Sequence, residues 1–316
     1  MTGASSWSGR CSGRVASVAA SADVVGGATA VNAPESLSSA AAPGSPERGA
    51  RRVGRRRLRV IERELSERDW AILASLDQHR FLTSRQLQAL HFHQHATTDA
   101  ATRICRRVLT RLCELGVVEH LARRVGGVRA GSASYVWRVG PVGDRLLRQA
   151  QGEGARARRK EPSARHLDHC LAIADCHLAL VTAARAGHLE LLRVATEPDS
   201  WRAYLGAGGA PELLKPDLYA VTVTGEYEDH WFVELDRATE SLPTLVRKCG
   251  QYERYRRTGR EQVETGVFPL VVWVVPDYQR ATKLQAALDT ARRLDTTLFR
   301  ITTPERFAEL VCGGTA

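Results

Sequence analysis

Apolar residues recur along this chain with two periodicities, one typical of helices and one typical of strands. The changes between them divide the chain into segments. Between residues 60 and 150, three segments carry apolar residues at the spacing of an amphipathic helix. The clearest begins at Asp99 and stops at Gly116, a residue type that suits the position after a helix end. Its apolar stripe consists of Ile104, Val108, Leu112 and Leu115. Beyond Gly116, two strand-like runs flank a basic, glycine-rich turn.

Capping sequences support the first two helices, because Ser66 begins a Ser-x-x-Asp sequence and Thr83 a Thr-x-x-Gln sequence. Three helices followed by a two-stranded hairpin is the order of a winged helix-turn-helix, whose third helix enters the major groove of DNA. The predicted DNA contacts are Arg103, Arg106 and Arg107 on the third helix and Arg123, Arg124 and Arg129 on the wing. The alternative is a protein–protein module whose arginines are solvated.

From about His166 onward the pattern predicts a second domain. A helix ending at Gly187 is followed by three strand candidates, and the last two are LLKPDLYAVTV and HWFVELD. Another helix precedes FPLVVWVVPD, a continuous apolar run typical of a strand buried on both faces. The order α-β-β-β-α-β, with a crossover helix before the fourth strand, predicts a mixed sheet flanked by helices. We therefore expect a two-domain protein of the α+β or α/β class.

Composition sets the predicted domain boundaries. Residues 1–58 hold few large apolar residues and end in RRVGRRRLR, which predicts a disordered basic arm. The winged-helix domain is expected over residues 60–150, followed by a polar, basic linker over 151–164. The second domain is expected over residues 165–312.

Charge and cysteine usage narrow the partners and the compartment. The formal net charge of +10 and the pI of about 9.6 favour a polyanion, and we expect double-stranded DNA. The seven cysteines form no C-x-x-C pair, which argues against a zinc ribbon and suits a reducing cytoplasm. No apolar run approaches the length of a membrane-spanning helix, so we expect a cytoplasmic protein without a membrane contact.

Candidate chemistry concentrates between Leu213 and Lys248. Asp217 lies near the start of one predicted strand, Glu234 and Asp236 lie late in the next, and Lys248 lies on the following helix. Carboxylates are the ligands that Mg²⁺ prefers, and bound Mg²⁺ activates water and stabilises charge on a phosphate. We therefore predict a catalytic group of Asp217, Glu234, Asp236 and Lys248. The predicted metal ligands are Asp217, Glu234 and Glu197.

The Pro-Asp pair at 216–217 and the Glu234-x-Asp236 sequence resemble the Pro-Asp … (Asp/Glu)-x-Lys motif of the restriction-endonuclease-like superfamily. Asp236 stands where that motif has lysine. Members of the superfamily are known to move this lysine to the next helix, so the resemblance implies that Lys248 takes its role. The alternative is a structural ion-pair network, in which Lys248 pairs with Glu234 and Asp236 pairs with Arg237.

Longer phrases, from about Leu65 to Thr303, resemble the replication-relaxation family of mobile genetic elements. The most specific phrase is FVELDRATES, which begins at Phe232, and KPD at Lys215 supports it. The resemblance implies a role in plasmid replication and in producing the relaxed, nicked form of DNA. It does not decide whether the protein cuts DNA itself.

Three other groups of side chains have simpler explanations than chemistry. They are the H-x-H-x-H sequence of His91, His93 and His95, the pair His166 and His169, and the tyrosines Tyr252 and Tyr255. The first group does not share a helix face, the second lacks another pair of ligands, and the third has helical spacing beside an apolar residue. We therefore predict helix ends for the histidines and packing for the tyrosines.

Two functions follow from these predictions. The first is a DNA-binding protein of plasmid or integrative-element replication or mobilisation, with Mg²⁺-dependent nicking activity and a relaxase or replication initiator as a protein partner. The second is a non-catalytic accessory factor or transcriptional regulator, whose nuclease-like domain is degenerate.

Overall fold

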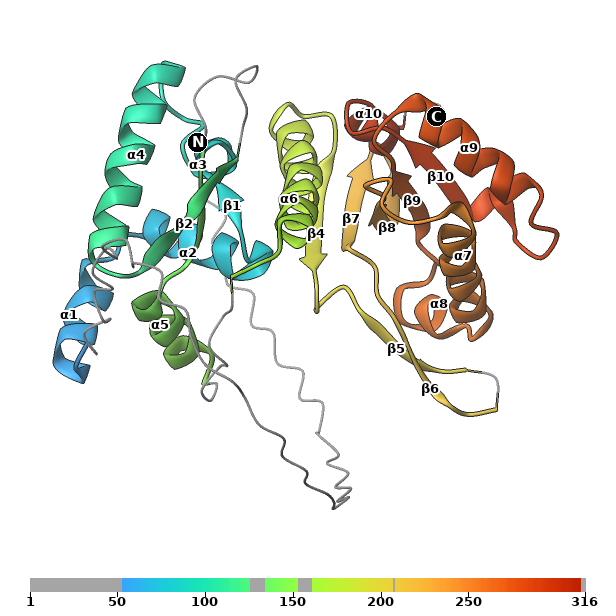
Figure 1. The fold of residues 1–316 in the computed structure, drawn as a ribbon, viewed down its shortest axis with the longest axis horizontal. Helices are drawn as coiled ribbons and strands as arrows, with labels where there is room; N and C mark the ends of the chain where they lie inside the picture. Colours follow the sequence, from blue (N-terminus) through green and yellow to red (C-terminus); the bar gives the residue numbers. More distant parts are fainter. Residues whose placement is uncertain (1–52, 126–133, 153–160, 207, 314–316) are drawn as a thin grey trace, which may run out of the picture. The chain divides into compact units, whose positions relative to one another are not determined.

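The computed structural model describes most of the chain after residue 52 (Figure 1). The described residues are 53–125, 134–152, 161–206 and 208–313. The chain separates into the units Met1–Arg51 and Arg52–Ala316, and the described residues belong to the second. They form a mixed α+β structure with ten α-helices, one short 3-10 helix and ten strands.

The first eight elements form a helical group around a small sheet. They are α1 (Arg55–Glu64), α2 (Glu67–His79), β1 (Leu82–Thr83), α3 (Ser84–His91), α4 (Thr98–Glu114), β2 (Val118–Val125), β3 (Ser134–Val139) and α5 (Pro141–Gln151). Strand β3 lies between β1 and β2 and is antiparallel to both. Helix α1 buries Leu58, so residues 55–58 of the predicted disordered arm are helical, a correction. Residues 1–52 of that arm lie outside the described residues.

The local sequence signals produce the predicted helix ends. The side chain of Ser66 accepts a hydrogen bond from the Asp69 N–H at 3.3 Å, and Asp69 accepts one from the Ser66 N–H at 2.8 Å. Thr83 and Gln86 form the same reciprocal capping box at the start of α3. Gly116 has a φ of +71°, a left-handed conformation that glycine adopts without steric cost after a helix end.

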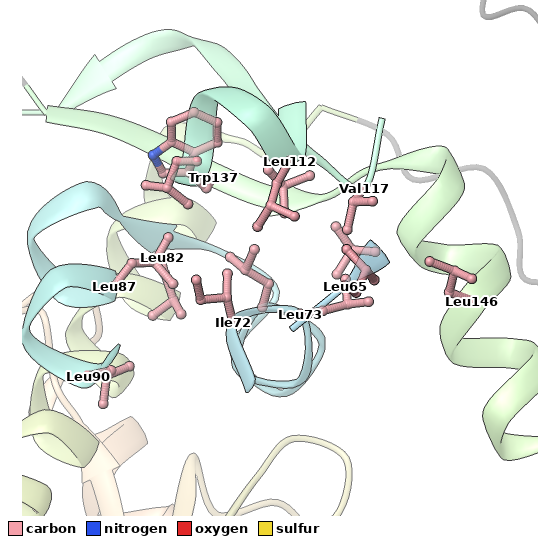
Figure 2. Packing of buried hydrophobic residues seen from close by; sticks show 14 of the residues in the cluster. Leu65, Ile72, Leu73, Leu82, Leu87, Leu90, Leu112, Val117, Trp137 and Leu146 are labelled. Carbon is pink, nitrogen blue, oxygen red and sulfur yellow. The ribbon is translucent and has the colours of Figure 1, made fainter. Parts of the chain in front are cut away.

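A hydrophobic core joins these helices to the β2–β3 hairpin (Figure 2). Leu73 of α2, Leu112 of α4 and Trp137 of β3 all belong to it. The buried residues of α4 are Ala101, Cys105, Leu109 and Leu112. The buried face of α4 is thus rotated slightly from the predicted stripe. Of the predicted residues, Leu112 is buried, whereas Ile104, Val108 and Leu115 are partly buried at the edge of the core.

Helix α6 (Ala164–Arg185) begins the second part and contacts both parts of the fold. Its side chains enter the core of the helical group, the core beneath the large sheet and a small cluster with Phe81 of the first part. By length and a mean hydropathy of 1.3, α6 resembles a membrane-spanning helix. Its packing on two sides is that of a core helix. It begins at the end of the predicted linker, of which residues 153–160 lie outside the described residues.

A five-stranded mixed sheet forms the centre of the second part, with the strand order β10-β9-β8-β7-β4. Its strands are β4 (Glu190–Thr196), β7 (Leu218–Thr224), β8 (Tyr227–Leu235), β9 (Leu270–Val274) and β10 (Phe299–Thr302). Strand β7 is antiparallel to β4 and β8, whereas β8, β9 and β10 are mutually parallel. The mixed sheet predicted from the sequence is therefore confirmed.

Helices cover both faces of this sheet. They are α6 and α10 (Phe307–Val311) on one face and α7 (Leu242–Arg257) and α9 (Tyr278–Asp289) on the other. Alternate residues of each strand point to opposite faces. Trp273 of β9 accordingly packs with α7 and α9, and its neighbour Val274 packs with α6 and α10. The 3-10 helix Thr296–Leu298 leads into β10.

Three elements are inserted within the predicted α-β-β-β-α-β order. The strands β5 (Arg202–Leu205) and β6 (Pro211–Leu214) form a separate antiparallel hairpin between β4 and β7, which projects from the sheet in Figure 1. The single strand expected from LLKPDLYAVTV is thus two strands, β6 and β7. The third element, α8 (Arg260–Thr265), follows α7.

Candidate functional site

Most of the residues predicted to be catalytic or metal-binding lie together where β7 begins and β8 ends. These strands are antiparallel, with Leu218 opposite Val233, so Asp217 lies beside the end of β8. The Leu235 N–H donates to Asp217 Oδ2 at 2.8 Å and fixes that carboxylate. A pocket of about 340 Å³ opens here. Its lining residues are Ser163, Arg165, His166, His169, Asp217, Glu234, Leu235, Asp236, Arg237, Thr239, Glu240, Leu245, Lys248 and Trp273.

Glu234 is held from two positions on α7. Lys248 Nζ donates to Glu234 Oε2, and the Tyr252 hydroxyl donates to Oε1. The two donors lie four residues apart, which places them on one face of the helix. The Glu234 side chain is only 1% exposed, whereas Lys248 keeps 27% of its side-chain surface. Part of the Lys248 side chain is therefore exposed, although its carboxylate partner is buried.

The electrostatics of the pocket are dominated by burial. Burial raises the pKa of Glu234 to about 8 against the opposing charge of Lys248, and the nearby Asp217 adds to the rise. Burial alone would lower the pKa of Lys248, but the two carboxylates outweigh it and raise that pKa. We therefore treat Lys248 as protonated. For Asp217, the hydrogen bond from His169 and the charge of Lys248 overcome burial and lower the pKa.

His169 is the pocket residue that sequence reasoning missed. Its Nε2 lies 3.2 Å from Asp217 Oδ1, and this hydrogen bond raises the pKa of His169 despite its partial burial. From the sequence, His169 is predicted only to belong to the start of a helix. It lies on the second turn of α6, after the cap formed by Ser163, whose side chain accepts from the His166 N–H. No local pattern pairs this helix position with Asp217, because the contact spans 48 residues.

Asp236 lines the pocket but is engaged elsewhere. Its Oδ2 accepts a hydrogen bond from Arg280 Nε at 2.5 Å, and its Oδ1 accepts one from the Ala238 N–H at 2.8 Å. Arg280 also donates to the Glu240 carbonyl at 2.6 Å. The ion-pair alternative predicted Arg237 as the partner of Asp236. In the structure, the partner is Arg280. Asp236 therefore ties the loop after β8 to α9.

Glu197 is not brought together with Asp217 and Glu234. It follows β4, and its carboxylate lies 3.8 Å from Arg80 at the end of α2. It lines a separate, small depression rather than the pocket described above. Of the predicted catalytic and metal residues, the pocket thus joins the carboxylates of Asp217 and Glu234 with the ammonium of Lys248.

The donor set can be tested against the divalent cation that the sequence implied. Mg²⁺ usually takes one or two carboxylates from the protein and completes its shell with water and phosphate. Asp217 and Glu234 supply two, and burial, together with the neighbouring charge of Asp217, raises the pKa of Glu234. Among the described residues, no three His, Cys, Asp or Glu side chains form a metal-ligand group. The site therefore fits a well-hydrated cation, and not one that needs a full protein shell.

The predicted DNA contacts are only partly described. Arg103, Arg106 and Arg107 are exposed on α4, opposite its buried face. Arg123 and Arg124 lie within β2, but their side chains are outside the described set, as is the whole of Arg129. The described arginines thus form an exposed basic face on one helix.

Three of the remaining sequence candidates have hydrogen-bond partners. Tyr252 and Tyr255 are buried, and their hydroxyls donate to Glu234 and Glu261, respectively. His91 is the last residue of α3 and hydrogen-bonds to Ser75 at 3.0 Å. The packing predicted for the tyrosines agrees with their burial, although Tyr252 also orients a pocket carboxylate.

These features define an α+β protein with an exposed basic helix and a pocket in which Asp217, Glu234 and Lys248 come together. The chain belongs to the replication-relaxation family, whose model matches residues 73–271. That match spans more than half of the chain and contains Asp217, Glu234 and Lys248. No curated protein and no solved structure matches the chain. Family membership is consistent with a role in plasmid replication.

Proposed function

We propose that the protein binds DNA during replication or mobilisation of a plasmid or integrative element, and nicks that DNA at the pocket. The observation that carries this proposal is the contact of Lys248 with Glu234 beside Asp217. An Asp, a Glu and a Lys therefore meet at one end of a mixed sheet, as the endonuclease-like motif requires. The lysine reaches this point from α7, although Asp236 occupies its usual sequence position.

DNA recognition is assigned to the amino-terminal part, interpreted as a winged helix-turn-helix. Support comes from the order of α2, α3, α4 and the β2–β3 hairpin, and from the three exposed arginines of α4. In such a module the third helix enters the major groove. Helix α4 would take that place, with Arg103, Arg106 and Arg107 on DNA. The hairpin that carries Arg123, Arg124 and Arg129 would form the wing.

Each pocket residue has a role that follows from its contacts. Asp217 and Glu234 would hold Mg²⁺, whose chemistry when bound is to acidify a water and to stabilise charge on the phosphate. The Lys248 ammonium would orient the nucleophile and attract the scissile phosphate. Tyr252 holds the Glu234 carboxylate by donating to Oε1, and His169 does the same for Asp217.

A plasmid-nicking assay tests this proposal. Purified protein is incubated with supercoiled plasmid and Mg²⁺, and the conversion to nicked circles is followed on a gel. We expect conversion by the wild type and a loss of at least about 10²-fold in Asp217→Asn, because a developing charge loses its stabilisation. Asp289→Asn, which alters an exposed carboxylate on α9, is the matched control and should leave nicking unchanged. Equal nicking by Asp217→Asn, or none by the wild type, would refute catalysis.

A second candidate function rests on the Asp236–Arg280 pair. A structural acid stands where the endonuclease-like motif has its lysine, which is expected of a degenerate centre. The protein would then be a non-catalytic partner of a relaxase or replication initiator, or a transcriptional regulator. In that case Asp217→Asn would still support plasmid maintenance, whereas Arg103→Ala combined with Arg107→Ala would abolish it by weakening DNA binding. Loss of maintenance with a folded, DNA-binding Asp217→Asn protein would exclude this candidate.

A further inference from the structure

The β5–β6 hairpin has two faces of opposite character. Its inner face packs on the body of the protein, where Tyr204 and Leu214 are buried. The Tyr204 hydroxyl donates to Glu212 across the hairpin at 2.5 Å. Arg202 donates to the buried Glu261 of α8 at 2.9 Å. The hairpin is therefore anchored firmly at its base.

The outer face is apolar and exposed. In the antiparallel register, Ala203 lies opposite Leu213 and Leu205 lies opposite Pro211, so the four side chains share one face. All four are exposed, and Leu205 and Leu213 keep 68% and 43% of their surface. Exposed apolar side chains gathered on one face of a projecting element are candidates for an interaction surface.

Cations surround the base of this apolar face. Arg260 Nη1 donates to the Ala203 carbonyl at 2.9 Å. Arg254 Nη2 lies 3.5 Å from Glu212. Lys215, directly after β6, places its Nζ 4.4 Å from the centre of the Trp201 ring. Arg260, Arg254 and Lys215 are all exposed, so three exposed cations flank the base of the apolar hairpin.

We propose that this hairpin is a DNA-binding arm whose apolar outer face enters the minor groove of duplex DNA. Minor-groove proteins insert leucine or proline side chains between base steps and bend the duplex. Leu205 and Pro211 are side chains of this kind at the far end of the hairpin. Arg254, Arg260 and Lys215 would contact the flanking phosphates, which positions a protein on DNA.

The basic surroundings favour DNA over a second copy of the chain as the partner. A two-fold symmetric dimer places the same surface on both sides of the interface. Joining two hairpins through their outer faces would bring both sets of cations together, whereas duplex DNA supplies a phosphate for each. The inference rests on the DNA-binding half of the proposed function and is independent of cleavage.

The arm also has a defined relation to the pocket. Strand β6 ends at Leu214, three residues before Asp217. The base of the hairpin therefore adjoins Asp217 along the chain, whereas Leu205 and Pro211 lie at its far end.

DNA bending by the full chain tests the arm. A short duplex carries donor and acceptor dyes at its ends, and energy transfer is followed during titration in EDTA, so that no cleavage contributes. We expect the wild type to raise the energy transfer. Leu205→Asp combined with Leu213→Asp should remove that rise and weaken binding by about tenfold. Leu192→Asp, at another exposed leucine on β4, is the matched control and should behave as wild type.

Three results would overturn the proposal that the hairpin is a DNA-binding arm. The first is a double variant that bends and binds DNA like the wild type. The second is a wild type that binds without bending, which leaves the DNA-binding half of the proposed function intact. The third is unchanged DNA binding together with a shift from dimer to monomer in sedimentation, which assigns the face to a second copy. If the wild type fails to bind the duplex, the arm and that half of the proposed function fall together.

Discussion

Glu234 and Asp236 lie two residues apart at the end of β8, and they have opposite surroundings. Asp236 is met by the Arg280 guanidinium on one oxygen and by a backbone N–H on the other. Glu234 is met by Lys248 and Tyr252, but it shares its pocket with a second carboxylate, Asp217. One carboxylate is held as part of the scaffold, and the other lies beside a second buried carboxylate in the pocket.

This difference shows why matching residue types alone does not identify a site. In the proposed endonuclease-like centre, Asp236 would occupy the position of the lysine, yet its contacts anchor the loop after β8 to α9. The lysine of that proposal would come from α7, where Lys248 reaches Glu234. Substitutions on the two sides of this comparison should therefore change different properties.

The largest expected effect is on the Glu234 side. Lys248→Met should lower the nicking rate by about 10²- to 10³-fold, because a cation that faces the developing charge is lost. DNA affinity should stay close to wild type, since most of the proposed DNA contacts lie on α4, the wing and the β5–β6 hairpin. The rate is measured under single-turnover conditions with supercoiled plasmid. Lys283→Met, an exposed lysine on α9, serves as the control. If Lys248→Met nicks DNA at a rate near that of the wild type, Lys248 has only a structural role, as the ion-pair partner of Glu234.

The next effect is on the Asp236 side. Arg280→Met should lower the free energy of unfolding by about 3 kcal/mol, because it leaves the carboxylate of Asp236, 1% exposed, without its partner. Urea denaturation measures the change. Glu309→Gln breaks an exposed ion pair with Arg306 and should cost less than about 1 kcal/mol. If Arg280→Met and Glu309→Gln lower the free energy of unfolding equally, the Asp236–Arg280 pair does not stabilise the scaffold as proposed.

A third effect concerns the pH dependence of stability. The pKa of Glu234 is raised from its usual 4.5 to about 8 in the folded protein. Between these values the folded state holds a proton that the unfolded chain has released, so this group's contribution to stability is lost as pH rises. Relative to Glu234→Gln, the wild type should lose stability from pH 5 to 8, by at most about 1.4 kcal/mol per pH unit. A difference that is flat or rises with pH would contradict the assigned environment of Glu234.

The sequence was most informative where chemistry is local. The capping residues Ser66 and Thr83, the glycine after α4 and the apolar run of β9 each predicted an element from its own neighbours. The phrase around Glu234 identified the end of β8, and helical spacing placed Lys248 on the next helix. The mixed sheet followed from the order of these elements.

The rest depends on contacts between distant residues. Arg280 reaches Asp236 across 44 positions and His169 reaches Asp217 across 48, so neither contact has a local signal. The β5–β6 hairpin was hidden because LLKPDLYAVTV reads as one continuous strand. Glu197 has the right residue type at the end of β4, but its carboxylate faces Arg80 instead of the pocket.

A structure determined with Mn²⁺ tests the central claim most directly. The claim is that Asp217 and Glu234 form one cation site with Lys248 beside it. The account predicts an ion at about 2.1 Å from an oxygen of each carboxylate, with the remaining ligands supplied by water. No ion in the pocket, or an ion held by Asp236 instead, would contradict it.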